Sequence, residues 1–194
     1  MTDEKLILVD LDGCLLLNRN RERYELDIPV LRNFYQAFLR IFYKFFGDEN
    51  IEYEYNEDLI RFLEEKGFER EYLLTARGFK DFKKNSKWMI NDFLERFDKC
   101  IFYPGTTLEG EEILESGLKE KITYLFGIGD TEYKINVAEY FSKDHDVFIV
   151  DNKIKTILES AKSSFIDNQF LIEDGEIFEV SKSLEGGHQF DKVS

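Results

Sequence analysis

The sequence predicts an α/β protein in which a parallel β-sheet lies between layers of helices. Short apolar runs recur along the chain, and segments with helical periodicity separate them. Several runs are apolar throughout, which is typical of strands buried on both faces of a sheet. Strands that alternate with helices favour a parallel arrangement. The 194 residues are enough for one domain, with or without a small inserted lobe.

Five runs are the expected strands of this sheet. They cover residues 6–9, 71–75, 99–103, 122–128 and 147–150. The helices expected between and after them cover residues 79–97, 108–118, 132–141 and 153–162. Because crossovers between parallel strands place helices on the sheet, we expect a five-stranded parallel sheet covered on both faces. Asp174-Gly175 is a hairpin signal and predicts an added hairpin over residues 164–180.

An aromatic segment interrupts this alternation between the first two expected strands. Asp27 and Pro29 predict the start of a helix that continues to about Phe46, and a second helix is expected over residues 57–66. The aromatic side chains of the first helix span more than one of its faces, which favours packing on several sides. The alternative interpretation is that the segment forms a lid over a site. Helix 29–46 is also a candidate homodimer interface.

Composition excludes several classes of protein. The net charge of −14 argues against a nucleic-acid surface and against docking on anionic membranes. Two cysteines, Cys14 and Cys100, form no disulfide framework, which favours a reducing compartment. The first residues are acidic where a signal peptide carries positive charge, and no apolar run is long enough for a membrane span. We expect a cytoplasmic protein without nucleic-acid or membrane partners.

Polar groups follow the expected strands where each strand ends. Asp10 and Asp12 follow the first strand, Thr75 the second, Asp130 the fourth and Asp151 the fifth. Ligands of parallel sheets bind at the carboxyl ends of the strands, so these groups are expected to meet. Clustered carboxylates need a cation, and a set made only of oxygen ligands favours Mg²⁺ over Zn²⁺.

The first of these segments carries the most specific pattern. A buried strand followed by Asp-x-Asp-Gly-x-Leu, here residues 10–15, resembles the signature of the haloacid dehalogenase-like (HAD) superfamily. Thr75 ends the next expected strand and precedes Ala76-Arg77, which is similar to the second motif of that superfamily. Gly129-Asp130 resembles its fourth motif. The resemblance covers residues 5–16 and about 70–162.

The resemblance implies a domain organisation. The core would be a Rossmann-like three-layer α/β unit, and the aromatic insertion would be a small helical cap of the type placed between the first and second motifs. The expected boundaries are residues 1–26 and 67–180 for the core, 27–66 for the cap and 181–194 for a loose tail.

Two positions of the pattern stay open. The third-motif lysine is Lys119 or Lys121, and Lys119 is preferred because Lys121 begins the expected strand. Lys134 stands where many members have a second metal-binding aspartate, a place that Glu132 would then fill. In the alternative register Asp151 is the fourth motif and Lys134 its lysine. Asp130 is preferred because it leaves the five core strands in order.

The resemblance also implies roles for these residues. Asp10 would attack phosphorus and form an aspartyl phosphate, and Asp12 would act as general acid and then general base. Thr75 and Lys119 would bind the phosphoryl oxygens. Mg²⁺ would be held by Asp10, by the backbone carbonyl of Asp12 and by Asp130.

The expected function is therefore a magnesium-dependent phosphatase. Its partner would be a small phosphomonoester, with a nucleotide or a sugar phosphate as examples. A phosphotransferase or mutase would use the same intermediate with an alcohol as acceptor. A catalytically inactive module with the same fold is the alternative that involves no enzyme, because a fold alone does not establish an activity.

Overall fold

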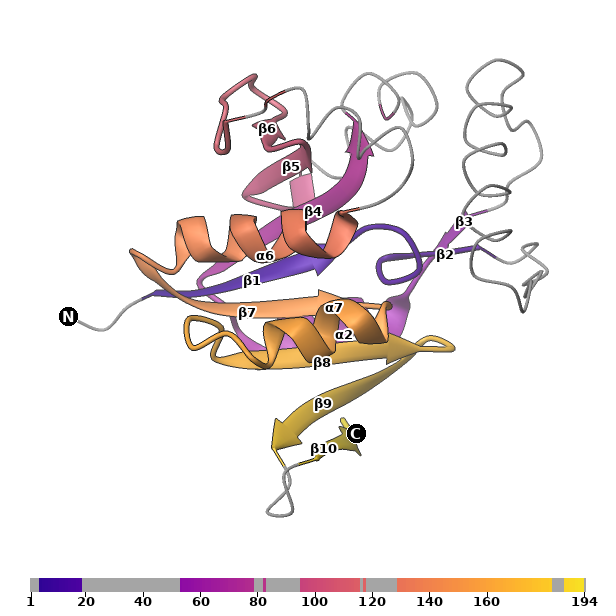
Figure 1. Ribbon diagram of the computed structural model, residues 1–194. Helices are drawn as coiled ribbons and strands as arrows, with labels where there is room; N and C mark the ends of the chain where they lie inside the picture. Colours follow the sequence, from indigo (N-terminus) through magenta and orange to yellow (C-terminus); the bar gives the residue numbers. More distant parts are fainter. Residues whose placement is uncertain are drawn as a thin grey trace, which may run out of the picture.

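A large mixed β-sheet forms the body of the protein in a computed structural model. The model describes residues 4–18, 53–78, 82, 95–115, 117, 129–182 and 187–193. Among these residues the sheet has eight strands in the order β10-β9-β8-β7-β1-β4-β5-β6, and β2 and β3 form a separate pair (Figure 1). The strands are β1 (Glu4–Asp10), β2 (Leu16–Asn18), β3 (Tyr53–Tyr55), β4 (Arg70–Gly78), β5 (Lys99–Tyr103), β6 (Thr106–Thr107), β7 (His145–Asp151), β8 (Asn168–Glu173), β9 (Glu176–Lys182) and β10 (His188–Lys192).

The predicted fold class, a five-stranded parallel sheet in a Rossmann-like three-layer core, is wrong for this sheet. Its strands β5, β4, β1, β7 and β8 run parallel, but β6, β9 and β10 run antiparallel to their neighbours. The sheet is therefore mixed and larger than expected. Helix is the minor part of the described residues, with α2 (Glu57–Lys66), α6 (Asp130–Phe141) and α7 (Ile154–Ser160).

Tight turns explain the antiparallel strands. Asp174 and Gly175 have φ angles of 50° and 87°, and they reverse the chain from β8 into β9 as the Asp-Gly pair predicted. Gly105, with φ 121°, begins the reversal from β5 into β6. The expected helix 108–118 is wrong over residues 108–115, which fold back instead so that Glu112 bridges Thr106.

The described parts of the expected insertion and tail pack with the sheet. Residues 27–52, with the aromatic helix 29–46, lie outside the described residues. Helix α2 packs on the sheet through Leu59, Phe62 and Leu63, in one cluster with the strands. At the other end of the chain β10, within the expected tail 181–194, pairs with β9.

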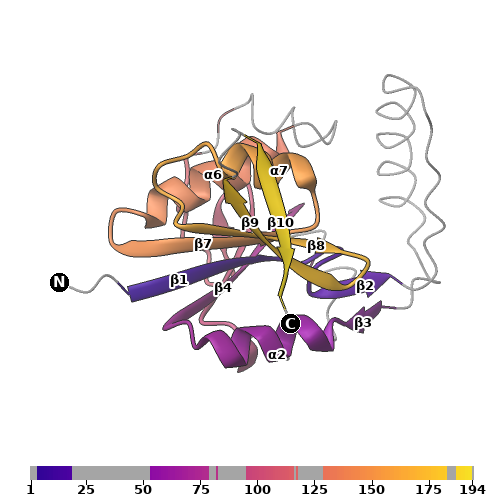
Figure 2. The same cartoon turned by 90° about the horizontal axis from the view of Figure 1, so that it is seen from below.

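Helices cover both faces of the sheet. Figure 2 shows α6 and α7 on one face and α2 on the other. Strand β1 lies in the middle and buries side chains on both faces: Ile7 and Val9 belong to the cluster with α2, and Leu6 and Leu8 to the cluster with α6 and α7. Alternation therefore directs Asp10, the last residue of β1, toward the face of α6 and α7. Within the described residues, no helix has the length and apolar character needed to cross a membrane.

Candidate functional site

The carboxyl end of β1 is the centre of the candidate site. Strand β1 pairs in parallel with β4 on one side and with β7 on the other, with Asp10 opposite Leu74 and Val9 opposite Val150. The next residues along these neighbouring strands are Thr75 and Asp151. Asp151 therefore lies beside Asp10 on the face of α6 and α7. Thr75 lies on the other neighbouring strand, where alternation places its side chain on the face of α2 with Leu73 and Phe102.

Helix α6 adds a buried lysine between the two carboxylates. Lys134 Nζ lies 2.9 Å from Asp10 Oδ1 and 2.6 Å from Asp151 Oδ2. The three residues are almost fully buried, with exposed fractions of 5% for Asp10, 1% for Lys134 and 0% for Asp151. Charged groups are rarely this buried unless they are paired or functional. We call Asp10, Lys134 and Asp151 the buried ionic cluster.

The buried ionic cluster contains one more negative charge than positive charge when all three groups are ionised. Burial raises the pKa of Asp10 to about 7; Lys134 opposes this shift, and Asp151 and Asp12 add to it. The pKa of Lys134 is also raised: burial disfavours its charged form, but attraction to Asp10 and Asp151 outweighs burial. Lys134 therefore stays charged, and Asp10 is poised to change protonation near neutral pH.

Asp12 lies at the rim of this cluster and has a different cation. Arg77 Nε donates to Asp12 Oδ2 at 2.7 Å, and the Arg77 Nη2 group donates to Asp12 Oδ1. The Asp12 side chain is 40% exposed, so it remains accessible to a ligand at this edge. The backbone N–H of Arg77 donates to the hydroxyl of Thr75 at 3.1 Å, a local contact within β4. Arg77 therefore fixes the orientation of the Asp12 carboxylate.

We expect Arg77→Lys to lower kcat about tenfold or more for any activity that uses Asp12 as acid and base. Lysine keeps the charge but cannot hold both carboxylate oxygens in the fixed geometry of a guanidinium group. Steady-state kinetics would measure the change. Arg70→Lys is the matched control, because Arg70 lies on the same strand and pairs with Glu4 at the opposite end. Equal kcat values for the two variants would contradict this role.

Gly13 follows the aspartate pair in a conformation that suits glycine. Its φ angle is 83°, and its N–H donates to the Leu16 carbonyl at 2.8 Å. A β-carbon at this position would lie 2.0 Å from Nδ2 of Asn152, the residue after Asp151. The loop after β1 and the loop after β7 therefore touch at Gly13.

We expect Gly13→Ala to destabilise the fold by about 1–3 kcal/mol, from positive φ and from the clash with Asn152. Gly110→Ala is the matched control: Gly110 has a φ of 89° with open space around it, so this variant tests backbone strain alone. Asn152→Ala should reduce the cost of Gly13→Ala toward that of Gly110→Ala. Urea denaturation of the three single variants, and of the double variant that combines Gly13→Ala with Asn152→Ala, would measure these differences. A Gly13→Ala variant no less stable than Gly110→Ala would show that the loops do not press together.

The remaining predicted site residues lie in different places. Asp130 is the first residue of α6, and its carboxylate accepts a hydrogen bond from Lys153 Nζ at 2.8 Å. Thr75 is fully buried within β4, which continues beyond the expected strand end to Gly78. Lys119 and Lys121, with the expected strand 122–128, lie outside the described residues. The residues gathered around Asp10 are thus those of the alternative register, Asp151 and Lys134.

The chemistry of the donor set is compatible with magnesium. Over the described ranges, no three histidine, cysteine, aspartate or glutamate side chains gather closely enough to hold a metal ion between them. Magnesium, however, is commonly held by one or two carboxylates and retains several waters. Asp10 and Asp151 supply two carboxylates on adjacent strand ends, and the excess negative charge of the buried ionic cluster favours a cation.

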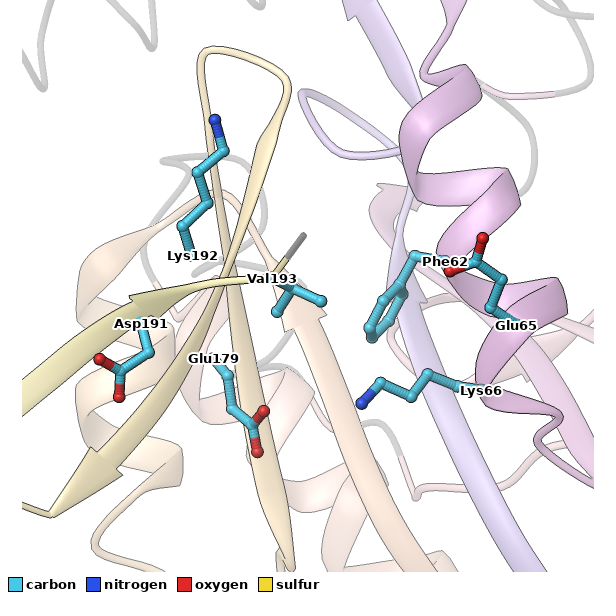
Figure 3. A pocket seen from close by; sticks show the side chains of 7 residues that line it. All are labelled: Phe62, Glu65, Lys66, Glu179, Asp191, Lys192 and Val193. Carbon is cyan, nitrogen blue, oxygen red and sulfur yellow. The ribbon is translucent and has the colours of Figure 1, made fainter.

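A separate groove lies between α2 and the β9–β10 hairpin. Its volume is about 410 Å³, and Figure 3 shows Phe62 and Val193 facing each other across it. Charged side chains surround this apolar floor: Glu65, Lys66, Glu179, Asp191 and Lys192. None of the residues predicted to carry chemistry lines the groove. Its volume alone therefore does not identify it as the active site. The buried ionic cluster has the stronger chemical features.

Sequence reasoning left two features of the site undecided or unrecognised. It held Asp151 and Lys134 as the second choice, although the apolar run 147–150 before Asp151 was as strong a strand signal as any other. It noted Arg77 without assigning it a partner, and the signal was its position two residues after Thr75. Comparisons with models of known protein families, with characterised proteins and with solved structures found no match to this chain.

Proposed function

We propose that this protein is a magnesium-dependent phosphatase that hydrolyses a small organic phosphomonoester through an aspartyl phosphate on Asp10. One observation carries the proposal: the Asp10 carboxylate is buried at the carboxyl end of the central strand, 2.9 Å from Lys134 Nζ. A carboxylate in this position can attack phosphorus while a fixed cation balances the charge of the phosphoryl oxygens. The Asp-x-Asp-Gly pattern at residues 10–13 supports the same chemistry.

The chain's own residues supply the acid, the base and the nucleophile. An Asp10 oxygen forms a bond to phosphorus as the bond from phosphorus to the leaving oxygen breaks. Asp12 gives its proton to that leaving oxygen. It later takes a proton from a water whose oxygen bonds to phosphorus as the bond from phosphorus to the Asp10 oxygen breaks, which releases phosphate and restores the Asp10 carboxylate. Lys134 takes the place proposed for Lys119 beside the phosphoryl oxygens. Arg77 holds Asp12 in position between the two steps.

Two carboxylates would hold the metal ion. Asp10 and Asp151 fit this role with the backbone carbonyl of Asp12, whereas Asp130 is paired with Lys153 in the first turn of α6. When bound, Mg²⁺ would shield the charge of the nucleophile from that of the phosphate. Burial raises the pKa of Asp10 to about 7, so part of this carboxyl is protonated near neutral pH. A nearby cation would lower the pKa and favour the ionised, nucleophilic form.

A binding module without catalytic activity is the second candidate. Lys134 already bridges both carboxylates, so the buried ionic cluster is partly neutralised without any metal ion. In that case the site would bind an anion or a partner and would release no phosphate. A phosphotransferase is a variant of the first proposal, in which an added alcohol competes with water for the aspartyl phosphate.

Phosphate release from a panel of small phosphomonoesters tests the proposal. The panel should contain nucleotide and sugar phosphates and be measured with Mg²⁺ and with EDTA. We expect release that needs the metal, disappears in Asp10→Asn and persists in Asp58→Asn, a matched change at an exposed position of α2. Release that survives Asp10→Asn would overturn the nucleophile. A folded wild type that releases nothing would favour the binding module.

A further inference from the structure

The hydroxyl of Tyr133 is a buried polar group without a hydrogen-bond partner among the described residues. Tyr133 is 5% exposed, and among the described residues its hydroxyl has no hydrogen-bond partner. Buried tyrosine hydroxyls usually find a partner, because a desolvated and unpaired hydroxyl destabilises the fold. An exception in a native structure therefore requires an explanation, and a ligand that binds at this place is one explanation.

Tyr133 lies beside the buried ionic cluster. It immediately precedes Lys134 in α6, and both side chains are buried on the face of the helix that covers the sheet. Its ring packs edge-to-face on Tyr103 with centroids 4.9 Å apart, and Tyr103 is the last residue of β5. The carboxyl end of β5 lies next to that of β4, where Phe102 is opposite Thr75. Tyr133 therefore belongs to the same edge of the sheet as Asp10.

The electrostatic surroundings keep this hydroxyl a neutral donor. Burial is the main cause that raises the pKa of Tyr133; Lys134 lowers it, and Asp10 and Tyr103 raise it further. Both Asp10 and Lys134 are thus close enough to Tyr133 to act on its ionisation. A hydroxyl that stays protonated can donate to an anion, and it adds no charge to a site that already has excess negative charge.

We propose that the Tyr133 hydroxyl donates a hydrogen bond to an oxygen of the phosphoryl group bound at Asp10. The inference rests on the proposed function and adds a residue to its substrate-binding set. A phosphoryl group joined to Asp10 brings three acceptor oxygens to a buried place, and each needs a donor. Lys134, between Asp10 and Asp151, can donate to one of these oxygens. Tyr133, on the same edge and with no hydrogen-bond partner among the described residues, supplies a further donor.

Tyr133→Phe is the variant that tests this role, because it removes the hydroxyl and keeps the ring that packs on Tyr103. Removing a hydroxyl that has a structural partner would lower the melting temperature of the ligand-free protein. Removing an unpaired hydroxyl should leave this melting temperature unchanged or raise it. The probe is orthophosphate, measured by calorimetry in the presence of Mg²⁺. We expect Tyr133→Phe to bind orthophosphate about tenfold or more weakly than the wild type. Tyr103→Phe, on the packed partner ring, is the control and should bind like the wild type.

Two measurements separate this inference from the proposed function. If phosphate release depends on Asp10 but Tyr133→Phe keeps wild-type orthophosphate affinity and kcat/KM, the role of Tyr133 is overturned and the phosphatase proposal stands. If the wild type releases no phosphate but binds orthophosphate more tightly than Tyr133→Phe, the hydroxyl serves a binding module. Absence of orthophosphate binding by the folded wild type would overturn the inference directly.

Discussion

Replacing Lys134 with methionine is expected to lower the free energy of unfolding by about 3–5 kcal/mol at pH values above neutrality, because it leaves two buried carboxylates without a cation. Methionine has nearly the length of lysine, so the space between α6 and the sheet stays filled. Lys134 is 1% exposed and contacts both Asp10 and Asp151, so solvent cannot replace its charge. Urea denaturation followed by far-UV circular dichroism would measure the loss.

The pH dependence of this variant gives the effect its signature. Without Lys134, Asp10 loses the cation that opposes its raised pKa, so the folded form would retain a proton at Asp10 that the unfolded chain has already lost. Stability of Lys134→Met should therefore fall as the pH rises from about 5 to about 8. Adding Asp151→Asn to Lys134→Met removes one of the two unpaired charges and should recover part of the loss.

Lys153→Met is the matched control for the charge itself. Lys153 pairs with Asp130 at 2.8 Å near the same edge of the sheet, but its side chain is 46% exposed. Loss of a pair that solvent screens should cost less than about 1 kcal/mol. If Lys134→Met were no less stable than Lys153→Met, the stability of the buried ionic cluster would not depend on the charge of Lys134.

The sequence predicted well what depends on local pattern. Strands β1, β4, β5 and β7 were expected because continuous apolar runs end at polar residues or turns, and burial on both faces requires such runs. The same pattern placed Asp10 and Asp151 at strand ends, but β4 continues past Thr75 to Gly78. The Asp174-Gly175 hairpin was predicted because few residue pairs adopt two successive positive φ angles.

What the sequence could not decide depends on neighbours in space. Asp130 and Asp151 both follow apolar runs, and local periodicity does not say which strand lies next to β1. The pairing of β7 with β1 decides that Asp151 lies beside Asp10. The hydrogen-bonded ion pair of Arg77 and Asp12 joins residues that are 65 positions apart in the sequence, and no local pattern predicts such a pairing. Strand β10 was expected as loose tail because its composition is polar, and it is ordered by pairing with β9.

Asp10→Asn is expected to stabilise the folded protein above neutral pH while it removes activity. The pKa of Asp10 is about 7 in the folded protein against an ordinary value of 3.8, and burial is the main cause. Between these two values the unfolded chain loses a proton that the folded chain retains, so stability falls as the pH rises through this window. The loss is complete above about pH 7 and absent below about pH 4. Asparagine has no charge to desolvate, so the variant should gain on the order of 1–4 kcal/mol at about pH 8.

Charge balance explains why this gain should appear at the nucleophile and not at its neighbour. With asparagine at position 10, Lys134 and Asp151 form one balanced pair, whereas the wild type has an unbalanced carboxylate. Asp12→Asn should give no such gain, because the Asp12 side chain is 40% exposed and Arg77 already balances it. Denaturation of the wild type and both variants at about pH 4 and about pH 8 would measure this. A gain that did not depend on pH, or a loss at high pH, would contradict the pKa shift.

Magnesium should reverse the comparison, and this connects stability with function. A cation held by Asp10 and Asp151 offsets the excess charge of the wild type, so Mg²⁺ should raise the melting temperature of the wild type more than that of Asp10→Asn. Asp10 would thus destabilise the fold without a cation and become favourable when a cation is bound. This combination is typical of a residue with a functional role and not a structural one. Equal shifts for both proteins would mean that the metal binds elsewhere, and Asp10 would then lose its proposed role as a ligand.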